Sequence, residues 1–290
     1  MNRFDFIKKS VLGTGVLMSS PALLGLTKNN IDELLPLEPV GFNHLPLSES
    51  KIMENSILHK ADSRGKADHG WLKSYHSFSF ANYYNPERMH FGVLRVLNDD
   101  HVEPGMGFGT HPHDNMEIIS IPLEGDLEHR DSMGNVAVIK NGDVQVMSAG
   151  SGITHSEYNK NANAAVKFLQ IWVFPNKRNV TPRYDQITLK EADRHNKLQQ
   201  ILSPDPKDEG VWIHQNAWFH LGTFDAGKET AYTVKAKENG VYVFVLKGSL
   251  TVNGVTVETR DGFGIWNTET LNIKATKDSE FLMMDVPMSV

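Results

Sequence analysis

Two segments of this chain repeat the same short pattern at an interval of about one domain. Leu123-Glu124-Gly125-Asp126-Leu127 and Leu246-Lys247-Gly248-Ser249-Leu250 share a Leu-x-Gly-x-Leu pattern, and Asn141-Gly142 in the first copy has Asp261-Gly262 as its counterpart in the second. A repeat of this size is typical of a duplicated structural unit. The sequence therefore predicts two similar domains in tandem.

Both copies are built from short apolar runs separated by turn residues. In the first copy these runs lie at Phe91–Leu97, Met116–Leu123, Val136–Lys140, Val144–Met147 and Val166–Phe174. Runs of this length, bounded by Gly, Asn and Asp, indicate an all-β sandwich or barrel. The best helix candidate is Leu189–Leu202, between the two β-rich regions. We expect β-barrel domains at 57–185 and 186–290, preceded by a proline-containing linker at 31–56.

The first copy contains two pairs of metal-ligand residues, His111-Pro112-His113 and His155-Ser156-Glu157, each behind a glycine-rich stretch. Residues i and i+2 of a strand share a face, so each pair can aim two ligands at one point. Three imidazoles and a carboxylate inside a barrel would hold a divalent transition metal. They would close a tetrahedral zinc site or leave two positions open on an octahedral ion. The alternative is a pair of hydrogen-bonded histidine clusters without metal.

The second copy lacks these ligand types. Counted from the shared patterns, Val234-Lys235-Ala236 falls where the first copy has His111-Pro112-His113, and Ala275-Thr276-Lys277 falls near the place of His155-Ser156-Glu157. We therefore expect one metal per chain, in the N-terminal barrel.

Composition excludes several function classes. The formal net charge of -6 at pH 7 argues against general nucleic-acid binding, which favours basic surfaces. The chain has no cysteine, which excludes disulfides, thiolate catalysis and cysteine-ligated metals.

The first 30 residues differ from the rest in composition. Met1–Lys9 contains Arg3, Lys8 and Lys9, and Ser10–Leu26 contains no charged residue. This layout is typical of a secretory signal or an anchor, although Phe4 stands where a twin-arginine signal has its second arginine. It predicts a periplasmic or exported protein; the alternatives are an ordinary apolar helix and a cytoplasmic protein. Beyond this segment no run is long enough to span a membrane.

From about Ile57 to its end the chain resembles the pirin family of the cupin superfamily. The resemblance is carried by His69–Pro86, Phe91–His113 with Asn115-Met116-Glu117, Glu128–Gly134 and Gly142–Glu157. It implies a bicupin fold, with two tandem jelly-roll-like cupin domains. It also implies Fe(II), or another divalent ion among Mn, Ni, Co, Cu and Zn, held by His111, His113, His155 and Glu157. Glu117 stands where the general cupin motif has its carboxylate ligand. The resemblance assigns it instead a place behind the ligands or a structural role as a hydrogen-bond acceptor.

The resemblance also implies an activity. Bacterial members resemble quercetin 2,3-dioxygenases, which open flavonols with O2 and release carbon monoxide. The expected partners are then a small aromatic substrate and O2. The protein is expected to be a monomer and to bind no nucleic acid. Glu157 is the expected catalytic base, and Phe108 and Met116 are expected to line the substrate pocket. The alternative is a non-enzymatic, redox-sensing pirin that acts through a protein partner.

The remaining histidines receive structural interpretations. We expect the segment His129-Arg130-Asp131 to form a salt bridge at a turn between strands. His76, His90 and His101 are expected to be structural or exposed.

Overall fold

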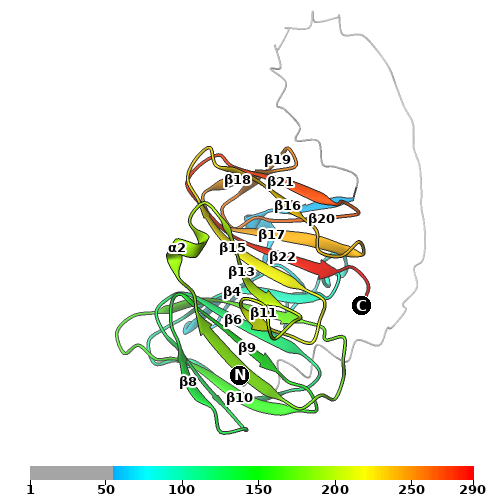
Figure 1. Cartoon of the computed structure of the whole chain (residues 1–290). Helices are drawn as coiled ribbons and strands as arrows, with labels where there is room; N and C mark the ends of the chain where they lie inside the picture. The colour runs from blue at the N-terminus through cyan, green and yellow to red at the C-terminus, as the bar shows by residue number, and fades with distance from the viewer. Residues whose placement is uncertain (1–54) are drawn as a thin grey trace, which may run out of the picture.

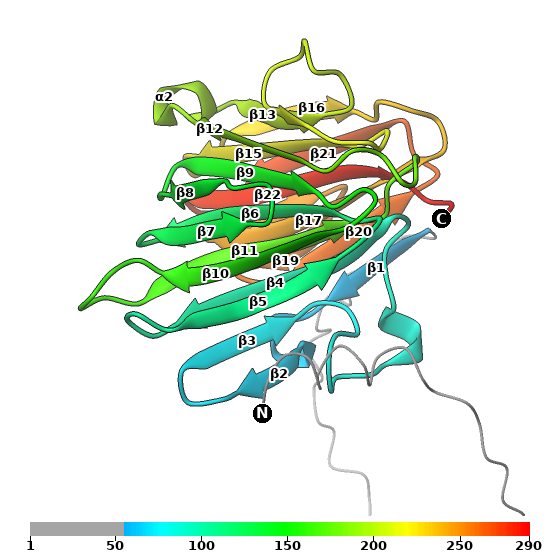
Figure 2. The same ribbon diagram turned by 90° about the horizontal axis from the view of Figure 1, so that it is seen from below.

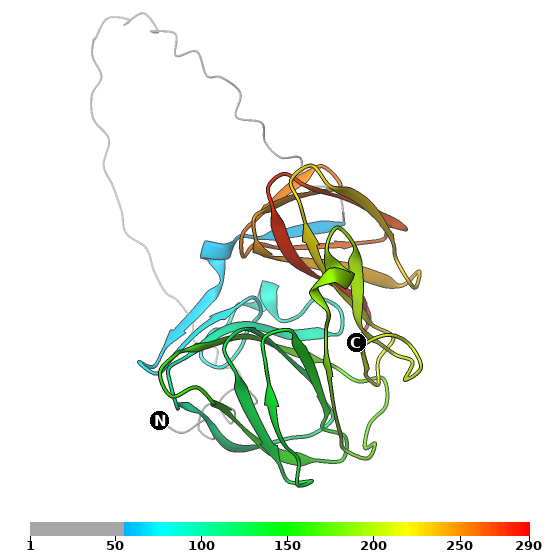
Figure 3. The same ribbon diagram turned by 60° about the vertical axis from the view of Figure 1, so that its left-hand side comes forward.

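The computed structural model describes residues 55–290, which form two stacked β-barrels (Figure 1 and Figure 3). The expected signal or anchor at 1–30 lies outside these residues, as does the linker at 31–56 except for its last two positions. Within residues 55–290, no helix has the length and apolar character needed to cross a membrane. The all-β, two-barrel prediction is confirmed.

The first barrel is formed by eleven strands: β2 (Gly65–Asp68), β3 (Leu72–His76), β4 (Leu94–Val102), β5 (Gly107–His113), β6 (Glu117–Glu124), β7 (Leu127–Asp131), β8 (Val136–Ile139), β9 (Asp143–Ser148), β10 (Ile153–Asn159), β11 (Val166–Val173) and β12 (Arg183–Thr188). They make a seven-stranded sheet in the order β12-β9-β6-β11-β4-β3-β2 and a four-stranded sheet in the order β5-β10-β7-β8. Figure 2 shows β2 and β3 at the edge of the larger sheet.

The second barrel repeats this plan. Its strands are β1 (Ser56–His59), β13 (Leu198–Ser203), β14 (Val211–Trp212), β15 (Trp218–Phe224), β16 (Glu229–Thr233), β17 (Asn239–Lys247), β18 (Ser249–Val252), β19 (Val255–Glu258), β20 (Gly262–Trp266), β21 (Thr270–Ala275) and β22 (Ser279–Pro287). The sheet orders are β1-β20-β17-β22-β15-β13-β14 and β16-β21-β18-β19. Three short helices complete the described residues: η1 (Ala61–Ser63), η2 (Pro86–Arg88) and α2 (Glu191–Arg194).

The repeated sequence pattern marks the same bend in both barrels. Gly125 lies between β6 and β7 with φ of 73°, and Gly248 lies between β17 and β18 with φ of 85°. Residues other than glycine rarely adopt this left-handed backbone conformation, so both copies require glycine at the bend. The strands corresponding to β5 and β10 in the second barrel are β16 and β21. Their buried side chains are Tyr232, Leu271, Ile273 and Ala275.

The first strand of the described residues belongs to the second barrel, although the strands that follow it form the first. β1 pairs antiparallel with β20 of the second barrel, and His59 accepts or donates a 2.9 Å hydrogen bond with the Tyr242 hydroxyl. At the other junction, β12 pairs with β9 of the first barrel up to Thr188. The expected division between 185 and 186 therefore falls inside β12, and the expected range 57–185 includes β1, which belongs to the second barrel's sheet.

The helix expected at Leu189–Leu202 is wrong over most of its length. Only Glu191–Arg194 is helical, and β13 begins at Leu198. Asn196 has φ of 55°, which an α-helix cannot contain, and β13 pairs with β15. Tertiary pairing thus overrides the local helical preference of this segment.

The two seven-stranded sheets pack against each other, and their shared apolar layer is the main core. Its fully buried members come from both barrels: Leu97, Ile119, Leu169, Phe219, Phe244 and Leu282. Because side chains alternate across a strand, the neighbouring residues of β4, β6 and β11 face the inside of the first barrel. That interior contains buried polar side chains, whereas the second barrel is filled by apolar ones such as Val243, Phe263 and Met283.

Candidate metal centre

The antiparallel pairing of β5 and β10 brings the two ligand pairs together. His111 lies opposite His155, and Ile153 lies opposite His113. The ligand nitrogens of His111, His113 and His155 lie within 4.8 Å of one another. His111 and His155 are buried and His113 is half-buried, so the group opens to solvent on the His113 side. This confirms the expected convergence of three imidazoles.

A register shift places Glu157 beside them. On β10, one residue separates His155 from Glu157, but their Cα partners on β5 are His111 and Phe108. The extra residue on β5 is a β-bulge, which turns Phe108 toward the same interior as His111. Glu157 is 1% exposed, and its Oε2 lies 4.0 Å from His155 Nε2. All four expected ligand side chains therefore share one interior region.

The hydrogen bond made by His111 leaves its ring suited to bind a metal. Its Nδ1 lies 2.8 Å from the Gly109 carbonyl oxygen, which can only accept a hydrogen bond. The neutral ring then carries its proton on Nδ1 and its lone pair on Nε2. A fixed tautomer of this kind is usual in metal-ligating histidines. Three imidazoles and a carboxylate, confined in a space this small, form a donor set suited to a divalent transition metal.

His155 has a different set of contacts. Its Nδ1 lies 3.4 Å from Nδ1 of His129, and Nε2 of His129 lies 3.2 Å from Asp131 Oδ2. The expected salt bridge at a turn is therefore wrong in its setting: His129 and Asp131 lie within β7, and their side chains are 1% and 0% exposed. Arg130 points outward, with its side chain 57% exposed, and binds Glu128.

Glu157 is held by two residues that the sequence analysis did not single out. Gln170 Nε2 lies 2.8 Å from each carboxylate oxygen of Glu157, and the Ser120 hydroxyl donates to Gln170 Oε1 over 2.9 Å. Both are polar residues inside apolar strands, in the runs Ile119-Ser120-Ile121 and Leu169-Gln170-Ile171. Such an interruption was the available signal, because a buried polar group needs a hydrogen-bond partner.

A cavity of about 200 Å³ lies along the same interior. Gln170, Asn98 and His76 are register neighbours across β11, β4 and β3, so the row that begins at Glu157 leads into this cavity. Its aromatic walls are Trp71, Phe80 and Phe108. Phe80 also packs edge-on against Trp172, whose ring lies 4.9 Å from that of His113.

The polar side of the cavity is a hydrogen-bonded group on β3 and β4. Ser74 donates to Asp100, and His76 Nε2 lies 2.8 Å from the Ser74 hydroxyl. Burial, assisted by the charges of Arg64 and His69, lowers the pKa of His76 to about 4. His76 is thus neutral near pH 7 and lines the cavity. His90 contacts the Gly92 carbonyl, and His101 is partly exposed beside Glu103.

The other expected pocket residue, Met116, lies elsewhere. It packs on the apolar cluster of Ile118, Met147, Ala149 and Ile153 and does not line the cavity beside Phe108.

Glu117 faces away from the imidazoles. Ser120 faces the barrel interior, so residue 117, three positions earlier, lies on the opposite face of β6. There its Oε2 accepts a 2.6 Å hydrogen bond from Ser148. Burial raises the pKa of Glu117 to about 7, with Ser148 and Arg183 opposing that rise. The contact that the structure shows is that of a structural hydrogen-bond acceptor.

The raised pKa makes Glu117 a source of pH-dependent stability. Between pH 4.5 and 7 the folded chain keeps a proton that the unfolded chain releases, so this contribution is lost as pH rises through that range. A shift of this size corresponds to at most ~3 kcal/mol. We expect Glu117→Gln to raise the free energy of unfolding at pH 8 but not at pH 5. Denaturant unfolding at both values tests this, with Glu124→Gln, exposed on the same strand, as the control. Equal effects of Glu117→Gln at the two pH values would contradict it.

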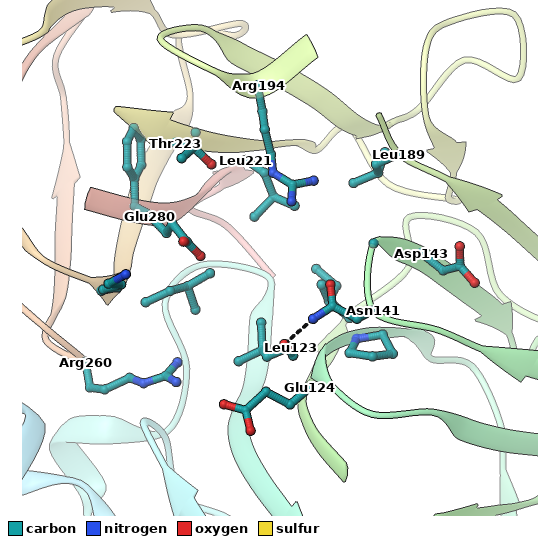
Figure 4. A pocket seen from close by; sticks show the side chains of 17 residues that line it. Leu123, Glu124, Asn141, Asp143, Leu189, Arg194, Leu221, Thr223, Arg260 and Glu280 are labelled. Atoms are coloured by element: carbon teal, nitrogen blue, oxygen red, sulfur yellow. Dashed lines mark hydrogen bonds between the residues drawn. The ribbon is translucent and has the colours of Figure 1, made fainter. Parts of the chain in front are cut away.

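A second cavity, of about 270 Å³, lies between the barrels. Figure 4 shows Arg194 and Arg260 directed toward it from opposite sides, with Leu123 and Leu221 between them. None of the described residues that line it is a histidine, and it is separate from the triad of His111, His113 and His155. The candidate site is therefore the interior of the first barrel.

Known proteins are similar to this chain over both barrels. The family model described as Pirin matches residues 58–173, and the one described as quercetinase C-terminal cupin domain matches residues 200–286. Quercetin 2,3-dioxygenase of Escherichia coli strain K12 is 45% identical over 230 residues, which cover 79% of this chain and 98% of that protein. A pirin-like protein of Caulobacter vibrioides is 40% identical, covering 77% of this chain and 96% of that protein.

Solved structures are also similar to this chain over most of its length. The crystal structure of YhhW from Escherichia coli has a TM-score of 0.77 and 44% sequence identity, covering 81% of this chain and 98% of that one. The structure of bacterial pirin YhhW in complex with nickel(II) has a TM-score of 0.76 and 44% identity, covering 81% of this chain and 100% of that one.

Proposed function

The chain belongs to the pirin family of the cupin superfamily, and on this basis we propose that it is a metal-dependent dioxygenase that cleaves flavonols such as quercetin with O2 and releases carbon monoxide. The observation that carries the proposal is the convergence of His111, His113 and His155 beside Glu157, whose register partner Phe108 lines a cavity with aromatic walls.

The four side chains suit several divalent ions. Imidazole accommodates Fe, Cu, Ni and Zn, and a carboxylate favours harder ions. We propose Fe(II) as the native metal; the structure of the related YhhW in complex with nickel(II) supports the binding of a divalent ion. When bound, the ion would supply Lewis acidity, which lowers the pKa of a substrate hydroxyl that it coordinates.

We propose Glu157 as the acceptor of that proton. Its carboxylate lies 4.0 Å from His155 Nε2 and is buried among the ligands. Gln170 donates to both of its oxygens and so holds the carboxylate plane in one orientation. A base held in one orientation beside the substrate hydroxyl needs little reorganisation at the moment of transfer, which is how positioned groups accelerate proton transfer.

The cavity gives the substrate its orientation. Trp71, Phe80 and Phe108 offer apolar faces to a flat ring, and the Ser74–Asp100 pair offers hydrogen bonds to its hydroxyl groups. A volume of about 200 Å³ is smaller than the ~300–1,000 Å³ of typical ligand pockets, so we expect the cavity to take one ring of the flavonol. The rest of the molecule would then lie toward the half-buried His113.

Reconstitution tests the proposal. Apo protein loaded in turn with Fe(II), Ni(II), Mn(II), Co(II), Cu(II) and Zn(II) is mixed with quercetin, and O2 uptake and carbon monoxide are measured together. We expect equal molar consumption and release with at least Fe(II), and neither in the chelated protein. The proposal would be contradicted if fully metallated protein consumed no O2 with any flavonol. If that protein also bound a protein partner in a way that depended on its iron state, the redox-sensing alternative would take its place.

Phe108 provides a test of the cavity. Phe108→Ala removes a ring that lines it and that packs edge-on against Trp71, with ring centroids 5.4 Å apart. Loss of this apolar contact should raise KM for quercetin ~10-fold, the equivalent of ~1.4 kcal/mol of binding free energy. Metal content should not change. Tyr84→Ala, at a tyrosine that is 73% exposed, is the control and should leave KM unaltered. An unchanged KM in Phe108→Ala would place the substrate elsewhere.

A further inference from the structure

A line of hydrogen-bonding groups runs from the candidate metal centre to a buried carboxylate. His155 Nδ1 lies 3.4 Å from His129 Nδ1, and His129 Nε2 lies 3.2 Å from Asp131 Oδ2. The side chains of His155 and His129 are each 1% exposed, and that of Asp131 is 0% exposed. Bulk water is therefore kept from all three side chains, and these two contacts link them to one another.

The direction of these hydrogen bonds is set at Asp131. Its Oδ1 accepts from the backbone N–H groups of Met133 and Asn135, at 2.9 and 3.1 Å, and its Oδ2 accepts from Asn135 Nδ2 at 2.9 Å. Three N–H donors therefore point at this carboxyl group, which favours its ionised form. An ionised carboxylate only accepts hydrogen bonds, so His129 must carry a proton on Nε2.

When His129 carries this one proton only, its Nδ1 is an acceptor, and His155 must donate from its own Nδ1. The lone pair of His155 is left on Nε2, the nitrogen that faces Glu157. The ring of Tyr184 packs on His129, with centroids 4.8 Å apart and planes 35° from parallel, and so limits rotation of the His129 ring.

We propose that Asp131 and His129 are positioning residues that fix His155 in the tautomer able to bind a metal, and that they thereby set the metal affinity of the centre. This inference rests on the metal centre proposed above, but not on its substrate. His111 reaches the same tautomer through a backbone carbonyl, which no side-chain substitution removes. The hydrogen bonds through His129 are made by side chains, so mutation can reverse their direction.

Two substitutions separate this role from a merely structural one. In Asp131→Asn the new amide can donate to His129 Nε2, which reverses the line and places the proton of His155 on Nε2. In His129→Gln the amide N–H can donate to Asp131 and the amide oxygen can accept from His155, which preserves the direction. Arg130→Gln changes the exposed residue between them and is the matched control.

The experiment measures two quantities at pH 8. The dissociation constant for Ni(II) is determined by competition with a chelator, and the tautomer of His155 in the apo protein is read from the two-bond 1H–15N couplings of its ring. We expect the Nδ1–H form in wild type, His129→Gln and Arg130→Gln, with dissociation constants within about threefold. We expect the Nε2–H form in Asp131→Asn, with Ni(II) binding weakened ~10–100-fold, as is typical of lost outer hydrogen bonds to a ligand.

Several results would overturn the inference. These are an Nε2–H tautomer in wild-type apo protein, wild-type affinity in Asp131→Asn, and an equal loss of affinity in His129→Gln. Because Asp131 also binds the backbone of the following turn, melting curves accompany each variant, and His129→Gln decides the matter should Asp131→Asn fail to fold. Correct tautomers and affinities in a protein inactive on flavonols would support the inference and overturn only the proposed activity.

Discussion

His155→Ala should remove the metal and the activity together. His155 supplies one of three imidazole nitrogens that lie within 4.8 Å of one another, and it is the ring on which His111, His113 and His129 all pack. Loss of an outer hydrogen bond to a ligand already costs ~10–100-fold in metal affinity, so loss of the ligand itself should exceed that. We expect less than 0.1 equivalents of metal per chain after dialysis, and turnover reduced by ~10³-fold or more.

Elemental analysis and O2 uptake measured on the same sample test this expectation. His101→Ala is the control, since this histidine is partly exposed beside Glu103 and belongs to neither ligand pair. Wild type should hold one equivalent per chain, because the corresponding strands of the second barrel present Tyr232, Leu271 and Ile273 to its interior. Metal that survives in His155→Ala at the wild-type level would refute the three-histidine centre.

Glu157→Gln should separate binding from chemistry. An amide oxygen can still ligate weakly, but an amide cannot accept the proton of the substrate hydroxyl. Removal of a general base typically lowers the rate by ~10²–10⁴-fold, and we expect kcat to fall in this range. Part of the metal should be retained, because the three imidazoles are untouched. Rates are therefore expressed per bound metal.

Glu157→Gln also changes the hydrogen bonds between residues 157 and 170, and a second substitution can compensate for that change. In the wild type its Nε2 donates to both oxygens of Glu157, and a glutamine at 157 would present one N–H group to it. The double variant Glu157→Gln with Gln170→Glu restores an acceptor opposite that N–H. If the single variant turned over at the wild-type rate with equal metal content, Glu157 would not be the base. If the double variant stayed as slow as the single variant, loss of the base at 157 rather than loss of its orientation would explain the lower rate.

Much of the fold and the ligand set could be predicted because they depend on local patterns. The Leu-x-Gly-x-Leu repeat marks a bend that needs glycine at Gly125 and Gly248, and these bends recur in both barrels. The His-x-His and His-x-Glu spacings place ligands on one face of a strand, and the pairing of β5 with β10 does the rest. These features are properties of single strands and of adjacent turns.

The features that could not be predicted arise from long-range pairing. Nothing near Ser56–His59 indicates that β1 joins β20, about 200 positions later in the chain. The bulge on β5 places Phe108, which strict alternation would put on the opposite face from His111, in the same interior. The contact of His129 with His155 depends on β10 lying between β5 and β7. Each requires the sheet order, which no local pattern contains.

The central claim is that this chain is a dioxygenase, and isotope labelling tests it most directly. The Fe(II)-loaded protein is incubated with quercetin under 18O2, and the ring-opened product and the released gas are analysed by mass spectrometry. We predict two 18O atoms in each molecule of the ring-opened product and one unlabelled carbon monoxide for each O2 consumed. A product without 18O, or O2 consumption that yields hydrogen peroxide and no carbon monoxide, would contradict the claim.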